Sequence, residues 1–229
     1  MEDNKKQEQT INTEDLKKET VDTVNQVKDT FKNVDIKKDA KEATGFVTSM
    51  FKDPFGTIKK IANDSTNKTF KIALIFVVIW TIAEFVDAFL SVMLRQHWSG
   101  SLVFSRILQI VKYTITPIIS ILVLSVIVYF MNKSNKKSLV TVMTSISIAK
   151  IPVMLASVVN LLTLISSNAL TLTNRFASFC SIVSIILVYF SIKSLFGEEQ
   201  NSKFFKKFVV IYAIYYVISL VIYYLGIYI

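Results

Sequence analysis

Residues 72–94, IALIFVVIWTIAEFVDAFLSVML, are the stretch that most clearly indicates the fold. An α-helix rises about 1.5 Å per residue, so this segment is long enough to cross the ~30 Å hydrocarbon core of a bilayer. Glu84 and Asp87 are its only charged residues. The stretch therefore predicts a transmembrane helix that carries two carboxylates.

Four further apolar stretches follow, at 107–131, 139–166, 176–196 and 208–229. Each is long enough to span a bilayer. Pro117 lies in the first of them and Pro152 in the second, and each proline removes a backbone donor from its helix, so both helices should be kinked. The sequence predicts an all-α polytopic membrane protein with five transmembrane helices.

Composition supports this fold class. Of 229 residues, 52% are hydrophobic and the formal charge is +9, and the mean hydropathy is +0.48, well above the values of soluble domains. Residues 1–71 carry a net charge of +1 and residues 72–229 a net charge of +8. The lysines of the apolar part form no basic stripe with interleaved aromatic residues, which argues against nucleic acid as a partner.

The basic residues beside the apolar stretches predict the orientation, because Lys and Arg are retained on the cytoplasmic side. One side has eleven lysines, namely Lys52, Lys59, Lys60, Lys68, Lys71, Lys133, Lys136, Lys137, Lys203, Lys206 and Lys207. The other side has Arg95, Arg106 and Arg175. We therefore expect a cytoplasmic N-terminus and, after five crossings, a C-terminus outside, at the plasma membrane if the protein is bacterial.

The polar residues before the first span divide into two predicted parts. Residues 1–50 contain apolar residues at alternating spacings of four and three, which predicts a charged amphipathic helical arm in the cytoplasm. Its apolar face is small and β-branched, which favours a partner coiled coil or a fluctuating helix over a firm membrane anchor. Residues 51–71 predict a second, interfacial helix with Asp53 as N-cap, Pro54 as its first residue, and Phe55, Lys59 and Lys60 at the juxtamembrane surface.

Ionisable residues at membrane depth are the candidate functional residues of the predicted five-helix domain, residues 72–229, because an intramembrane charge is usually paired or functional. Counting from the helix ends places Glu84 at the depth of Lys150, and Asp87 at that of Lys112. Two ion pairs that set helix register are one interpretation. A polar path for protons, ions or a lipid headgroup is another. Asn160 lies with Pro152 on a small, polar helix face suited to close packing or to lining such a path.

Signatures of catalysis or metal binding do not occur in the sequence. His97 is the only histidine, Cys180 is the only cysteine, and the five glycines form no phosphate-binding loop. We therefore expect neither an enzyme, nor a metal site, nor a cofactor.

Two segments resemble the Yip (Ypt-interacting protein) domain family. The first is MFKDPFGTIKKI at 50–61, and the second is the basic loop KKSL at 136–139 followed by IPVML at 151–155. The resemblance covers about residues 50–229 and implies a five-span membrane domain. Eukaryotic members of this family engage Rab GTPases, whereas many bacterial members carry an N-terminal zinc ribbon, which a charged helix replaces here. The 23 lysines against three arginines favour a bacterial member.

These features lead to two principal functional hypotheses. The first is a non-enzymatic membrane scaffold that recruits a protein partner through residues 1–50. The second is a small permease or channel component with a polar path at Glu84, Asp87 and Lys150. A toxin-neutralising membrane protein is a third class, without specific residues behind it. The bilayer is a partner in all three, and the sequence leaves a homo-oligomer open.

Overall fold

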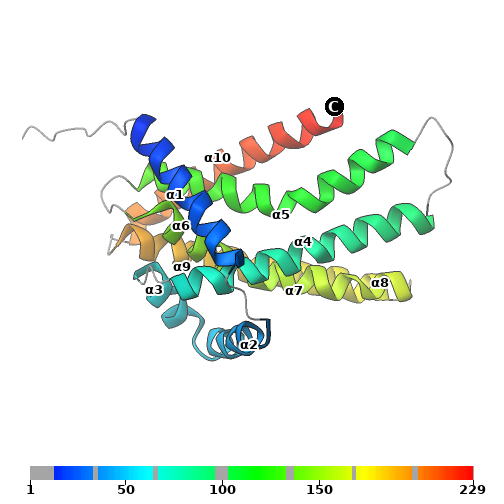
Figure 1. The fold of residues 1–229 in the computed structure, drawn as a ribbon, viewed down its shortest axis with the longest axis horizontal. Coiled ribbons are helices and arrows are strands. Elements are labelled where there is room, and N and C mark those ends of the chain that lie inside the picture. Colours follow the sequence, from blue (N-terminus) through cyan, green and yellow to red (C-terminus); the bar gives the residue numbers. More distant parts are fainter. Residues whose placement is uncertain are drawn as a thin grey trace, which may run out of the picture. The chain divides into compact units, whose positions relative to one another are not determined.

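A computed structural model describes residues 13–32, 36–63, 67–95, 103–132, 137–166, 169–197 and 201–228 (Figure 1). Nearly all of these residues are helical, and none of them lies in a strand. The helices are α1 (Thr13–Lys32), α2 (Ile36–Lys52), α3 (Pro54–Asn63), α4 (Asn67–Arg95), α5 (Val103–Met131), α6 (Leu139–Ala149), α7 (Ile151–Asn160), α8 (Leu162–Ile165), α9 (Leu170–Phe196) and α10 (Asn201–Tyr228). The all-helical prediction is confirmed for this part of the chain.

Four helices are long and apolar enough to cross a membrane, namely α4, α5, α9 and α10. The bent run from α6 to α8 makes a fifth span if it is counted as one crossing. These segments correspond to the five predicted stretches, but α4, α5, α9 and α10 each begin several residues earlier than predicted. Hydropathy marks only the apolar part of a helix, whereas backbone hydrogen bonding continues into its polar first turns.

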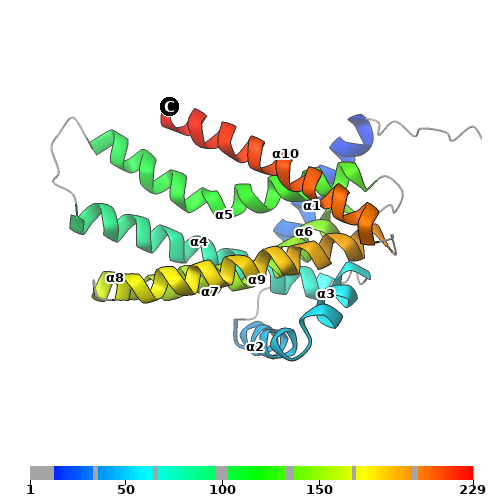
Figure 2. The same ribbon diagram turned by 180° about the vertical axis from the view of Figure 1, so that it is seen from behind.

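The bundle is built around α6, which is buried on almost every side. α6 packs against α3, α4, α5 and α9, and α7 packs against α4 and against α9, along which it runs (Figure 2). α10 packs mainly on α5. Asn132 joins two helix ends, because its side-chain amide donates to the carbonyl oxygen of Leu195 at 3.1 Å. The first part of the third predicted span, α6, is thus the core of the bundle, whereas Val158, Leu162 and Ile165 in its second part are exposed.

The third span breaks at Lys150, where α6 and the α7–α8 run meet at a bend of 48°. Pro152 lies at the start of α7 and has no N–H to continue the hydrogen bonds of α6. The Ser184 hydroxyl of α9 donates to the carbonyl oxygen of Ala149 at 2.8 Å, beside the break. By contrast, α5 continues as one helix through Pro117, although it changes direction along its length (Figures 1 and 2).

The helices of the N-terminal polar region belong to two compact units. One compact unit contains α1, and a second contains α2 to α10. Ala43 and Met50 of α2 are buried within the hydrophobic core of this second unit. The apolar residues expected on one arm therefore divide between the two units, and those of α2 pack within the second unit.

The start of α3 has the predicted N-cap. The Asp53 carboxylate accepts a hydrogen bond from the backbone N–H of Gly56 at 2.9 Å, and Ile58, Ile61 and Ala62 are buried on the inner face of the helix. A Cβ at Gly56 would overlap the Asp53 carboxylate. A larger residue at position 56 would therefore require the Asp53 side chain to shift from its capping position.

Removing the cap should weaken the junction of α2 and α3. Asp53→Ala is expected to destabilise the protein by about 1 kcal/mol, because an unpaired N–H is left at the start of α3. Asp53→Asn keeps a side-chain oxygen and should change stability by only a few tenths of that amount. Thermal unfolding in detergent measures both variants, and equal melting temperatures for the two would contradict the assignment of the cap.

Candidate functional site

Lys150 is held at the helix break by hydroxyl groups. Its side chain is only 9% exposed, and its ammonium donates a hydrogen bond to the Ser120 hydroxyl of α5. The Ser120 and Tyr215 hydroxyls are hydrogen bonded to each other at 2.8 Å, and the ammonium lies 5.4 Å from the centre of the Tyr215 ring. Lys150, Ser120 and Tyr215, the lysine cluster, therefore connect the broken span to α5 and α10.

Tyr215 stands at the end of a row of aromatic rings that fastens α10 to α9. Tyr189 of α9 packs against Phe204 and Phe208 at centroid distances of 5.1 and 5.0 Å. Phe208 then contacts Tyr212 at 4.8 Å, and Tyr212 contacts Tyr215 at 5.8 Å. Beyond Ile211 no residue of α10 whose exposure is described is fully buried, so the lysine cluster is a polar attachment of its more exposed half.

Glu84 has a different set of partners. One carboxylate oxygen accepts hydrogen bonds from the Trp80 indole at 3.1 Å and from the Ser157 hydroxyl at 2.6 Å. The indole also lies 3.0 Å from the Ser157 oxygen. Glu84, Trp80 and Ser157, the glutamate cluster, join α4 to α7. Two neutral donors thus stabilise this carboxylate, and no cation of the described ranges forms an ion pair with it.

The predicted ion pair between Glu84 and Lys150 does not occur, because each residue is engaged by its own cluster. The prediction is wrong because it placed Glu84 and Lys150 at the same depth by counting residues from the ends of the apolar stretches. Glu84 lies 17 residues after Asn67, the first residue of α4, and its partner Ser157 lies 18 residues after Leu139, the first residue of α6. Lys150 lies only 11 residues after Leu139, and the seven residues between Lys150 and Ser157 correspond to roughly 10 Å along a helix.

The remaining residues of the predicted polar network lie in the same spans. Asp87 and Lys112 are partly buried on α4 and α5, and these two helices pack side by side. Both residues take part in interactions, and their mutual pairing stays a prediction. Asn160 ends α7, and its carbonyl oxygen accepts a hydrogen bond from Thr163 at 2.8 Å.

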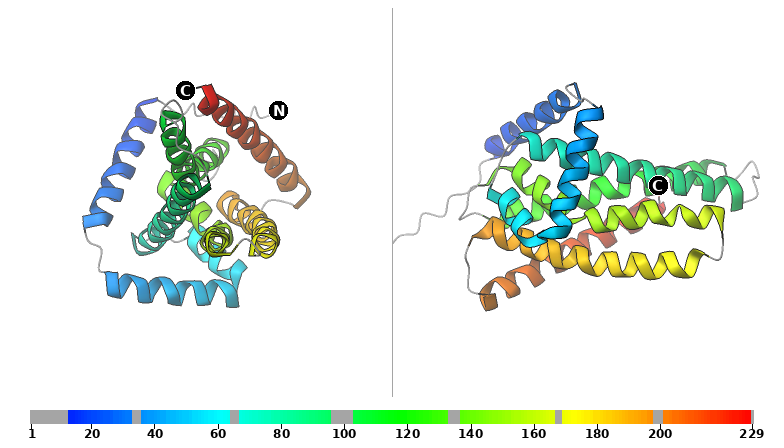
Figure 3. Two further views of the ribbon diagram at one scale, coloured as in Figure 1. Left: turned by 90° about the vertical axis from the view of Figure 1, so that its right-hand side faces the viewer. Right: turned by 90° about the horizontal axis from the view of Figure 1, so that it is seen from below.

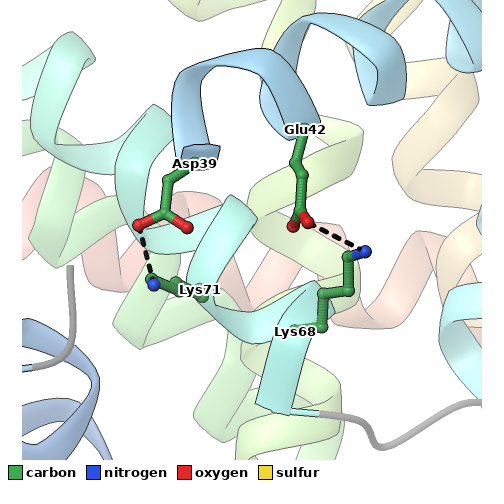
Figure 4. Close-up of polar contacts among 4 residues, drawn as sticks. All are labelled: Asp39, Glu42, Lys68 and Lys71. Atoms are coloured by element: carbon green, nitrogen blue, oxygen red, sulfur yellow. Dashed lines mark ion pairs between the residues drawn. The ribbon is translucent and has the colours of Figure 1, made fainter. Parts of the chain in front are cut away.

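Two ion pairs between α2 and α4 were not anticipated from the sequence. Asp39 pairs with Lys71 at 2.7 Å, and Glu42 pairs with Lys68 at 3.2 Å (Figure 4). A signal was present, because both acids and both lysines are three residues apart and so lie on one face of their helices. The pairing was missed because Asp39 and Glu42 were expected to lie in a cytoplasmic arm separate from the spans.

Within the described ranges, no group of three or more His, Cys, Asp or Glu side chains is arranged to hold a metal ion. Cys180 is a buried free thiol on α9. His97 lies outside the described residues.

The contribution of the Tyr215 hydroxyl to the lysine cluster can be tested by removing that hydroxyl alone. Tyr215→Phe should destabilise the protein by about 1.5–3 kcal/mol, because it removes a hydroxyl from a network that contains a buried charge. Tyr212→Phe is the matched control, since this neighbouring tyrosine contacts the same aromatic row but its hydroxyl has no hydrogen-bond partner among the described residues. Thermal unfolding in detergent compares the two variants, and similar losses of stability would contradict a stabilising role of the lysine cluster.

No family model, no curated protein and no solved structure matches the chain. The resemblance to the Yip domain family therefore stays a prediction that rests on the segments at 50–61 and 136–155.

Proposed function

We propose that the protein is a non-enzymatic, multi-pass membrane protein of Yip-like type that recruits a protein partner to the cytoplasmic face of the membrane through α1. The observation that carries this proposal is the docking of α2 onto the first span. A helix fixed to a span in this way can hold a neighbouring helix close to the bilayer. The excess of flanking lysines supports a cytoplasmic location for α1 and α2.

The attachment of α2 combines apolar and ionic contacts. Ala43 and Met50 lie in the core of the bundle, and the Asp39 carboxylate, in a residue only 5% exposed, is paired with Lys71. Only three residues separate α2 from α1. Val21 and Val24 of α1 are more than half exposed, which suits the apolar face of a helix that awaits a partner.

Capture by the full-length protein in detergent tests the proposal. Val24→Asp with Val27→Asp places two charges on the apolar stripe of α1 and is expected to abolish capture of a cytoplasmic partner. Lys18→Asn with Asn25→Asp changes the net charge equally on the polar face and should leave capture intact. The same set of captured proteins for both variants would refute recruitment through this stripe.

A polar path is the second candidate function, favoured by the helix break at Lys150. Discontinuous membrane helices often form substrate sites in transporters, and Lys150 and Glu84 are both held by neutral groups. Flux of protons or ions across vesicles that contain the protein tests this candidate. Glu84→Gln and Lys150→Met should each reduce the flux at least tenfold, and unchanged flux in both would eliminate the path.

A further inference from the structure

The junction of α2 and α3 presents two aromatic rings beside the spans. Phe51 at the end of α2 is 72% exposed, and Phe55 in the first turn of α3 is 47% exposed. The Phe55 ring packs at 4.3 Å from the ring of Phe190 near the end of α9. Ile186, one turn away on α9, is itself exposed, and exposed apolar residues of a spanning helix face lipid. The junction therefore lies at the lipid-facing side of the bundle.

Lysines surround these rings. Lys52, Lys59 and Lys60 are exposed, and Lys137 is brought to the far end of α3 by a contact of 3.5 Å with Asn63. The acids of α2 do not offset this charge, because Asp39 and Glu42 are paired with Lys71 and Lys68, and the Asp53 carboxylate caps α3. The surface formed by Phe51, Phe55, Lys52, Lys59 and Lys60, the junction surface, thus carries positive charge around exposed aromatic rings.

The direction of α2 also suits a membrane interface. α2 lies across the direction of α7 and α9 in both views of Figure 3. A helix that lies across the spans is oriented along the membrane plane, where it can place aromatic rings at the boundary of the acyl chains and lysines among the headgroups.

We propose that the junction surface binds anionic phospholipid headgroups of the adjacent leaflet. This inference rests on the membrane placement in the proposed function and adds a lipid preference to it. Anionic lipids attract basic juxtamembrane segments, and the exposed rings favour a lipid surface over a soluble acidic partner. Only three residues separate the end of α3 from the start of the first span, α4. This short connection keeps the lysines of α3 at the headgroup level.

Quenching by spin-labelled lipids measures this preference in the full-length protein. Cys180 is the single cysteine, so a Cys180→Ser background with Thr48→Cys accepts one nitrobenzoxadiazole dye, one turn from Phe51 on an exposed part of α2. Vesicles contain equal fractions of a quenching lipid, either spin-labelled phosphatidylglycerol or spin-labelled phosphatidylcholine. Quenching by phosphatidylglycerol should exceed that by phosphatidylcholine about threefold or more at low salt, and the difference should shrink in 1 M salt.

The matched variants are Lys59→Gln with Lys60→Gln, and Lys203→Gln with Lys206→Gln. All four lysines are exposed, and the second pair removes the same charge from α10. The first pair should bring the quenching ratio close to one, and the second should leave it unchanged. Equal quenching by the two lipids in the parent protein would overturn the inference, as would equal effects of the two variants. Absence of quenching by either lipid would also overturn the inference and would favour a soluble acidic partner as the ligand of the junction surface.

Failure of this inference is distinguishable from failure of the proposed recruitment. The lipid measurement depends on α2 and α3 alone, whereas partner capture depends on the apolar stripe of α1. Loss of the quenching ratio with intact capture rejects only the lipid preference.

Discussion

Exchanging the two charges, Glu84→Lys together with Lys150→Glu, is expected to lower the folded yield further than either single change. The Trp80 indole N–H can only donate a hydrogen bond, so a lysine at position 84 would meet a donor instead of an acceptor. A glutamate at position 150 would lose the hydrogen bond from the lysine ammonium to Ser120. Each change leaves a poorly compensated charge among packed helices, at a cost of about 3–5 kcal/mol per site.

Folded yield and thermal unfolding in detergent measure this outcome. The control removes the charges without reversing them, as Glu84→Gln with Lys150→Met. This control should be milder, because an amide can still accept from Trp80 and a methionine fills the space of the lysine stem. Recovery of the parent yield by the exchanged pair would show that Glu84 and Lys150 are direct partners and would contradict the two separate clusters.

The second large effect is expected at the α2 docking site. Asp39→Lys should release α2 from the first span, because it replaces a buried ion pair with two lysines and exposes Ala43 and Met50. Adding Lys71→Asp should restore docking by reversing the pair. We expect a coupling energy between positions 39 and 71 of about 1–3 kcal/mol. Chymotryptic cleavage at Phe46, which is packed against the core and is unchanged in all variants, is the measurement, and it should accelerate roughly tenfold or more when α2 is released.

The neighbouring pair provides the comparison. The side chains of Lys68 and Glu42 are 65% and 28% exposed, whereas those of Lys71 and Asp39 are 23% and 6% exposed. Water screens an exposed pair, so the same exchange at positions 42 and 68 should give a coupling of about 0.5 kcal/mol or less. Equal coupling energies at the two pairs would contradict a docking site that depends on the buried pair.

The helices long and apolar enough to cross a membrane could be located from the sequence because a bilayer imposes a local rule. A span needs about 20 apolar residues in succession, and this rule holds whichever helices lie beside it. The cap at Asp53 was predictable for a similar reason, since a cap involves only residues within one turn.

The partners of the buried charges were not predictable in this way. Their identity depends on where along its neighbours each helix begins, and an offset of seven residues moves a side chain by roughly 10 Å. That offset places Ser157 rather than Lys150 opposite Glu84. Tyr215 joined the lysine cluster without any sequence signal, because α10 is apolar on several faces and its packed side follows from contacts with α5 and α9.

The chain's own chemistry thus specifies a helical protein, the positions of apolar stretches long enough to cross a membrane, the interruption near Pro152, and a charged amphipathic region before the first of these stretches. Each of these properties arises from residues that are close in sequence. Folding in three dimensions decides that α6 is the centre of the bundle, that α2 belongs to the bundle while α1 does not, and that Glu84 and Lys150 lie in separate clusters. These outcomes depend on the relative register of whole helices, which side-chain packing between distant segments determines.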